Sequence, residues 1–199
     1  MRRLTLALAL LLACVGAAGA QEDEVETDRP DVSNSTKTVA PGAVQIETGV
    51  SYAHTRIGGA AADRRLSAEA AARVGLTERL EVRVDAEPFV RLRGDDEATG
   101  TGDYTLAVKY RFWDPPKDSL LPSLGLQPFV KPPIAEEPLG SGKTDFGLTG
   151  LASFDLPADF SLDVNGGVAA LGQRRGYLAQ AQVSASLSRE RISQAYFGA

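Results

Sequence analysis

The stretch Pro138–Thr144, with the sequence PLGSGKT, has the residue types of a loop that grips phosphate. Such a loop is written G-x-x-x-x-G-K-[ST], and the backbone amides between its two glycines wrap the phosphate. The position of the first glycine is held by Glu137, whose carboxylate repels phosphate. The residues that follow, TDFGLTGLASFDL, alternate like a strand, whereas a phosphate loop opens a helix. The stretch therefore predicts a turn between two strands, with no nucleotide and no other cofactor.

The single histidine, His54, is the next candidate for chemistry. A catalytic histidine needs a nucleophile and an orienting acid within reach. Ser51 and Ser67 are candidate nucleophiles, but neither lies in a recognisable motif. We therefore expect no catalytic residues and predict that His54 is an interfacial polar side chain.

An acidic stretch offers carboxylate oxygens of the kind that calcium prefers. It contains Asp95, Asp96, Glu97 and Asp103. The spacing D-x-[DN]-x-[DN]-G of a calcium-binding EF-hand is missing. We expect a solvated outer loop over 94–103 and no metal site.

The largest polar constellation is a row of alternating charges on one predicted strand, with two cations on the next. Its members are Glu81, Arg83, Asp85, Glu87 and Arg91, followed by Lys109 and Arg111. We expect these side chains to line the lumen of a barrel. Two interpretations stay open: the row lines a solute path, or its acids and bases pair across strands and fill a narrow barrel.

The first residues have the features of an export signal. Arg2 and Arg3 precede the apolar stretch 4–17, and a small-residue cleavage site, Ala-Gly-Ala, ends at Ala20. An alternative is a lipoprotein box ending at Cys14, the only cysteine. We predict a signal peptide at 1–20, an irregular periplasm-facing segment at 21–42 and a β-barrel domain at 43–199. The chain carries a net charge of −5, which argues against a nucleic-acid partner.

From residue 43 onward, apolar and polar residues alternate with a period of two, as in strands with one apolar face. These strands are long enough to cross a tilted bilayer, their polar face is charged, and aromatic residues gather near their ends. The predicted strands are 44–56, 66–77, 80–92, 104–112, 121–131, 144–156, 159–171 and 177–188. The aromatic residues expected at the membrane interfaces are Tyr52, Phe89, Tyr104, Phe112, Trp113, Phe129 and Tyr177.

The predicted connections alternate in length, as in outer-membrane barrels. Outer loops are expected at 57–65, 94–103, 132–143 and 172–176, and periplasmic turns at 77–79, 114–119 and 157–158. After the last strand, SRERISQAYFGA predicts another turn and the start of a ninth strand. One hypothesis is that at least one strand is missing, and the other is a barrel of eight strands with a short tail.

Three separated blocks resemble the bacterial outer-membrane transporter family named after the phenol meta-cleavage degradation pathway. They are TDRPDVSNSTKTVAPGAVQIETGVSYAHT (27–55), GTGDYTLAVKYRFWD (100–114) and PLGSGKTDFGLTGLASFDL (138–156). The resemblance makes Gly140, Ser141, Gly142, Lys143, Thr144 and Asp145 a loop motif of the family. It implies a β-barrel that moves small hydrophobic or aromatic compounds.

The sequence thus predicts an all-β, antiparallel transmembrane barrel of at least eight strands in the outer membrane. Its expected partners are outer-membrane lipid, a small-molecule solute and the barrel-assembly machinery. Two alternatives remain: a structural or adhesive barrel with a plugged lumen, and a soluble periplasmic β-sandwich that binds a ligand.

Overall fold

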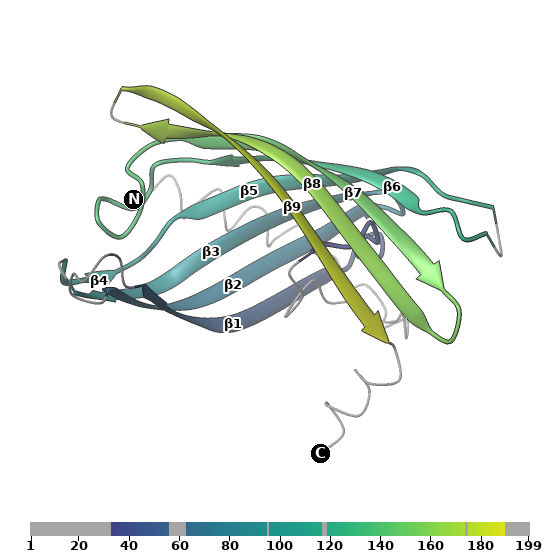
Figure 1. Ribbon diagram of the computed structural model, residues 1–199, viewed down its shortest axis with the longest axis horizontal. Helices are drawn as coiled ribbons and strands as arrows, with labels where there is room; N and C mark the ends of the chain where they lie inside the picture. The colour runs from purple at the N-terminus through teal and green to yellow at the C-terminus, as the bar shows by residue number, and fades with distance from the viewer. Residues whose placement is uncertain (1–32, 56–62, 95, 117–118, 174, 190–199) are drawn as a thin grey trace, which may run out of the picture.

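The computed structural model describes residues 33–55, 63–94, 96–116, 119–173 and 175–189. The predicted signal peptide, Cys14 and the expected ninth strand at 192–199 lie outside these residues. The described strands are β1 (Val44–Thr55), β2 (Asp63–Thr77), β3 (Leu80–Arg93), β4 (Ala98–Gly100), β5 (Tyr104–Trp113), β6 (Ser123–Lys131), β7 (Asp145–Leu156), β8 (Phe160–Gln173) and β9 (Gly176–Arg189) (Figure 1).

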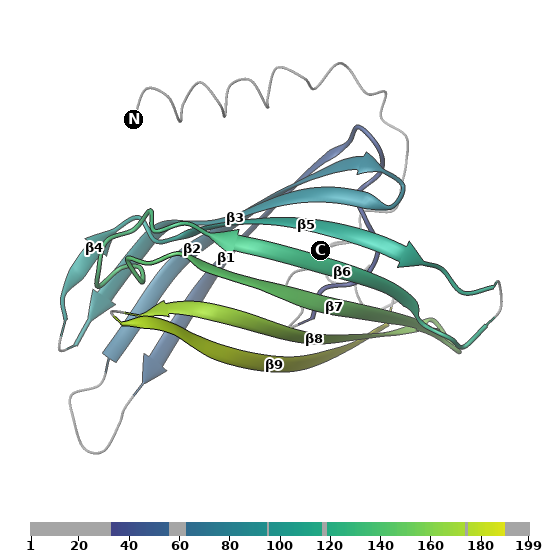
Figure 2. The same cartoon turned by 90° about the horizontal axis from the view of Figure 1, so that it is seen from above.

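All the strands belong to one antiparallel sheet with the order β1-β2-β3-β5-β6-β7-β8-β9, and short β4 pairs with β3. The sheet is strongly curled, so that it forms half of a barrel wall (Figure 2). The prediction of an all-β, antiparallel barrel sheet is therefore confirmed. Each of the eight long strands corresponds to a predicted one, because alternation and turn residues are local signals.

The connections differ from the prediction at several strand ends. β6 starts at Ser123 and not at residue 121, so the connection before it is longer than predicted. β4 lies inside the expected loop 94–103 and continues the pairing of β3 beyond its hairpin with β5. Residues 63–65 belong to β2, and residues 172–173 belong to β8. The loops expected at these ends are shorter than predicted, because the strands pair further toward their tips.

The convex face of the sheet is apolar across its whole width. Partners directly opposite one another in neighbouring strands share a face, and one row of such partners runs through all eight long strands. This row consists of Ile46, Ala72, Val84, Leu106, Val130, Phe146, Ala170 and Ala179. Its large members are exposed, with 72% of Ile46 and 48% of Phe146 accessible.

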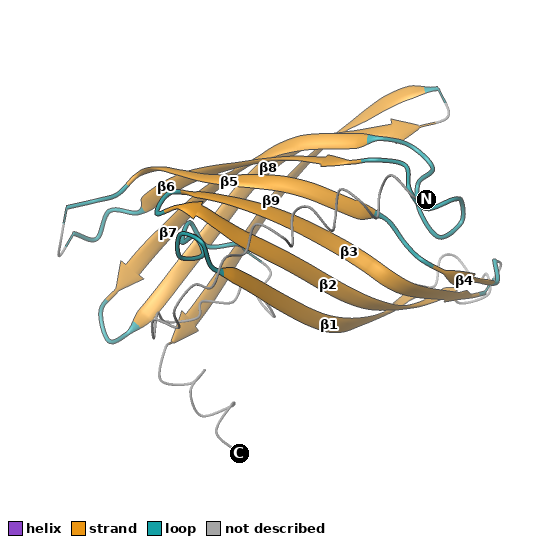
Figure 3. Ribbon diagram, turned by 180° about the vertical axis from the view of Figure 1, so that it is seen from behind, coloured by secondary structure: helices purple, strands orange, loops and turns teal. Residues whose placement is uncertain are grey.

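The concave face is polar and buried, which reverses the usual distribution of a water-soluble protein. Its buried charged side chains are Glu47, Arg73, Glu81, Arg83, Lys109, Asp145 and Asp163. Figure 3 shows strands and loops alone in the described part of the chain. Among these residues, no helix has the length and apolar character needed to cross a membrane.

Residues 33–42, which we call the strap, have no regular structure and cross the concave face from β9 to β2. Ser33 bonds Ser184 of β9, Thr36 bonds Ser153 of β7, and the Gly42 amide donates to the Gly75 carbonyl of β2. Ser33, Ser35 and Thr36 are buried. Sequence reasoning treated this segment as an irregular stretch facing the periplasm and did not find its contact with the sheet.

A β-bulge interrupts β3 near Pro88. Ala86 is opposite Ala70 of β2, but Phe89 is opposite Ala68, so β3 contains one extra residue between these pairs. Proline has no N–H to complete a ladder and is found at such irregular positions. Beyond the bulge the alternation of β3 reverses: Val90 is fully buried, whereas Phe89 is 41% exposed on the convex side.

The crossing of strap and sheet yields a test at Gly75. A Cβ atom there would overlap the carbonyl oxygens of Val39 and Ala40, whereas a Cβ at Gly166 has open space. We expect Gly75→Ala to lower the free energy of unfolding in detergent micelles by about 1–3 kcal/mol, as overpacking does. Gly166→Ala is the matched control and should cost less than about 0.5 kcal/mol. Equal urea denaturation curves for the two variants would contradict the position of the strap.

Candidate functional site

A buried ion-pair cluster joins the first three strands on the concave face. Arg73 of β2 donates to both carboxylate oxygens of Glu81 on β3, at 2.7 and 2.9 Å, and to Glu47 of β1 at 3.0 Å. At most 4% of each of these side chains is exposed. Glu81 also accepts the Val39 amide of the strap at 2.9 Å. The cluster therefore fastens the strap to the wall with charged hydrogen bonds.

Other members of the predicted charged row on the concave face also have partners within the protein. Arg83 binds Asp85 at 2.9 Å, and Lys109, fully buried, donates to the Lys37 carbonyl of the strap at 3.2 Å. Arg111 binds Asp114 at 3.1 Å. These contacts favour internal pairing, the second of the two interpretations, for this part of the row.

Arg91 lies on the opposite face from the rest of the row. Its cross-strand partner is Leu66, which is 38% exposed on the convex side. The bulge near Pro88 causes this difference from the sequence expectation, because it shifts the alternation of β3 by one residue.

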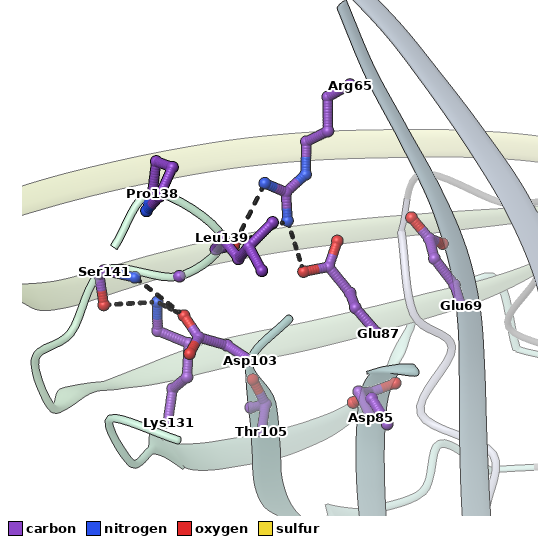
Figure 4. Close-up of a pocket in the computed structure, with 12 residues that line it drawn as sticks. Arg65, Glu69, Asp85, Glu87, Asp103, Thr105, Lys131, Pro138, Leu139 and Ser141 are labelled. Atoms are coloured by element: carbon purple, nitrogen blue, oxygen red, sulfur yellow. Dashed lines mark hydrogen bonds and ion pairs between the residues drawn. The ribbon is translucent and has the colours of Figure 1, made fainter. Parts of the chain in front are cut away.

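A second polar cluster surrounds Lys131 at the end of β6. The Lys131 ammonium contacts Asp103 at 3.0 Å and the Ser141 hydroxyl at 3.1 Å (Figure 4). It also contacts Asp145 at 2.7 Å. Asp103 also accepts the amides of Ala135 and Ser141, and Asp145 accepts the Gly172 amide of β8. The Lys131 cluster thus connects the ends of β6, β7 and β8 with the loops that precede β5 and β7.

The loop motif Gly140–Asp145 forms part of this cluster. Ser141 and Asp145 contact Lys131, while Lys143 is exposed. A Cβ atom on Gly140 would come within 2.6 Å of the Ala135 Cβ, and Gly142 has a positive φ of 59° that favours glycine. Thr144 precedes β7, so the stretch joins two antiparallel strands and not a strand and a helix. The predicted turn is confirmed.

A cavity of about 530 Å³ lies beside this cluster. Arg65 crosses its edge, binding Glu87 at 2.7 Å and the Leu139 carbonyl at 3.3 Å, so that loop 132–144 is held over the concave face (Figure 4). The other charged residues that line this cavity are Glu69, Asp85, Asp103 and Lys131. The cavity is therefore a charged pocket at one end of the sheet, with more carboxylates than cations.

A second cavity, of about 370 Å³, lies deeper on the concave face. It shares Asp85 and Thr105 with the first cavity and extends to Asn34 of the strap. Most of its lining residues carry amides or hydroxyls, and the others are Asp85, Ala107, Phe129 and Val183. The two cavities are therefore neighbours on the concave face, and we call them together the groove.

The residues considered for catalysis and for calcium do not form a site in the described residues. His54 lies on the convex side of β1, whereas Ser67 is 3% exposed on the concave side with Ser51 opposite it. Asp103 is paired with Lys131, and Asp96 and Glu97 are exposed. No group of three metal-ligating side chains occurs in this part of the chain.

Fold and groove together define a curled, antiparallel barrel wall with a polar interior. A family model described as "Putative MetA-pathway of phenol degradation" matches residues 27–191, so the chain belongs to this family. The resemblance inferred from the three sequence blocks is confirmed. Comparisons with curated proteins and with solved structures gave no match.

Sequence reasoning missed three contributors to the groove: Arg65, Lys131 and Asn34. Arg65 lies in the expected outer loop 57–65 and Lys131 at the end of a predicted strand, where a charge is typical of a solvated surface. The available signal was the pair of acids in the family blocks, Asp103 and Asp145. Two carboxylates that approach each other need a cation between them, and Lys131 is that cation.

Lys131 and Lys143 give a matched pair of substitutions. Lys131→Met leaves Asp103 and Asp145, whose side chains are 10% and 8% exposed, without their shared cation. We expect a loss of about 3 kcal/mol in the free energy of unfolding, as for a broken buried ion pair. Lys143→Met removes an exposed charge and should change it by less than about 0.5 kcal/mol. Similar losses in the two variants, measured by urea unfolding in micelles, would argue against the cluster.

Proposed function

We propose that this protein is an exported outer-membrane β-barrel that gives small hydrophobic or aromatic compounds a passive path across the membrane. The observation that carries the proposal is the reversed burial: exposed apolar side chains on the convex face and buried charges on the concave face. Exposed apolar side chains on the convex face are favourable in contact with lipid. Buried charges on the concave face are favourable in a lumen that is wet or in which the charges pair with one another. The proposed activity needs no nucleotide, metal or covalent step.

The groove supplies the path in this proposal. A solute enters at the charged cavity, passes Asp85 and Thr105, and reaches the amide-lined cavity next to the strap. The aromatic class of solute comes from the family description, and the groove supports small size and a polar route. Assembly into the membrane would use the barrel-assembly machinery that inserts such sheets.

A second candidate function is a structural barrel with a plugged lumen, and the strap favours it. Residues 33–42 cross the concave face and bury Ser33 and Thr36 against it. A soluble β-sandwich is less well supported, because a sandwich covers its apolar face with a second sheet. The described strands form a single sheet.

The first experiment separates these candidates. The protein is expressed with its own leader in a Gram-negative host, and the outer-membrane fraction is compared boiled and unboiled by electrophoresis. A heat-dependent mobility shift supports a closed barrel, and conductance in planar bilayers then separates a path from a plug. Recovery from the soluble periplasm would overturn the membrane proposal.

Lipid contact predicts a clear difference between two leucines. Leu148 is 42% exposed on the convex face of β7, whereas Leu121 is 56% exposed in the connection between β5 and β6. We expect Leu148→Arg to lower the free energy of unfolding in vesicles by about 2–4 kcal/mol, the cost of a cation in the bilayer. Leu121→Arg should have little effect. Equal tolerance of arginine at both positions would contradict a lipid-facing convex surface.

A further inference from the structure

We propose that the second cavity is a binding site for small, uncharged ring compounds that carry hydroxyl groups, with Phe129 as the surface on which the ring stacks. The inference deepens the proposed function by naming a selective site on the path. It rests on that function for its biological role, but binding is measurable without transport.

Phe129 is an exception to the polar character of the concave face. Its cross-strand partners are Ala107, which is 2% exposed, and Gly147. A Cβ atom on Gly147 would lie 2.6 Å from the Phe129 ring, so the glycine leaves the space that the ring occupies. The aromatic residue predicted for a membrane interface thus lines the cavity instead.

Groups that both donate and accept hydrogen bonds surround the ring. They are the amides of Gln127, Asn165 and Gln182 and the hydroxyls of Thr105, Thr149 and Ser184. A ligand hydroxyl donates one hydrogen bond and accepts others, so it suits such a mixed lining. The cavity thus offers one aromatic surface among several groups that can hold a ligand hydroxyl.

The strap holds two of these amides in place. The backbone N–H of Asn34 donates to the side-chain oxygen of Asn165 at 2.7 Å. The side-chain NH₂ of Asn34 donates to the side-chain oxygen of Gln127 at 3.4 Å. Asn165 in turn donates to the Asn34 carbonyl at 2.8 Å. Side chains that are already positioned lose less conformational entropy when a ligand binds.

The charge of the lining excludes anions. Asp85 is the one ionisable side chain among the residues that line this cavity, and Arg83 already binds it. A carboxylate ligand would meet a like charge and no free cation, which disfavours it. The volume of about 370 Å³ suits a single small ring.

The test uses the full chain in detergent micelles and equilibrium dialysis with three probes. Catechol is an uncharged aromatic ring with hydroxyls, myo-inositol is a saturated one, and benzoate is an aromatic anion. We expect catechol or myo-inositol to bind, with benzoate at least tenfold weaker. Binding of both uncharged probes supports a site for any small ring that carries hydroxyl groups. Binding of only one of them shows whether the site prefers an aromatic or a saturated ring. Failure of both to bind, or benzoate binding as tightly, would overturn the proposal.

Two variants assign the site. Phe129→Ala should weaken binding about tenfold through loss of the stacking surface. Phe89→Ala, an aromatic residue on the convex face, is the control and should leave binding unchanged. Gln182→Leu on strand β9 keeps the Phe129 ring and removes one amide from the cavity, so it should also weaken binding. This second variant keeps the test valid if Phe129→Ala disturbs folding. Unchanged binding in both cavity variants would overturn the assignment.

Conductance distinguishes this proposal from the proposed function. A protein that binds catechol through Phe129 but conducts no ions supports the site and contradicts the passive path. A protein that conducts, yet binds none of the uncharged probes, supports the path and overturns the site.

Discussion

The Arg73 cluster is the interaction on which the arrangement of the wall and the strap depends. A guanidinium that is almost fully buried is tolerated only when its hydrogen bonds are satisfied. Glu47 and Glu81 supply them from the strands on either side, and Glu81 also binds the strap at Val39. Because the convex face is apolar, the polar groups of the concave face pair with one another and with the strap. The strap provides many of these partners.

The sequence predicted the strands and most of their faces, because alternation and turn residues are local properties. It failed where one backbone detail changed the register. Pro88 stands in an unbroken alternating pattern. This pattern does not reveal that two residues of β3 lie opposite one residue of β2 at this point. The extra residue in β3 turns Val90 inward and Arg91 outward. A proline within a long strand was the available warning, since it cannot complete a ladder.

The site was predicted less completely, because its contacts join residues far apart in the chain. The charges of β3 and β5 were assigned to the polar face, but not their partners: Lys109 binds the carbonyl of Lys37 in the strap. Asp103 and Asp145 lie in two separate family blocks. Only the fold brings both acids to Lys131, which neither block contains. Pairing of this kind depends on strand order and register, which a single sequence leaves open.

The strap is held in two different ways, and this bears on whether the proposed path is open. Near β2 and β3 it is fixed by the backbone hydrogen bond from Gly42 to Gly75 and by the Val39 N–H, which donates to the Glu81 carboxylate. Near β8 and β9, Ser33 bonds Ser184 and Asn34 bonds Asn165, and these are hydrogen bonds between neutral groups. Each neutral bond contributes only about 0.5–1.5 kcal/mol, whereas separating a buried charge costs several. The part of the strap beside the Phe129 cavity is therefore the less costly part to move. Moving this part of the strap breaks neutral hydrogen bonds and leaves the ion pairs of the wall intact.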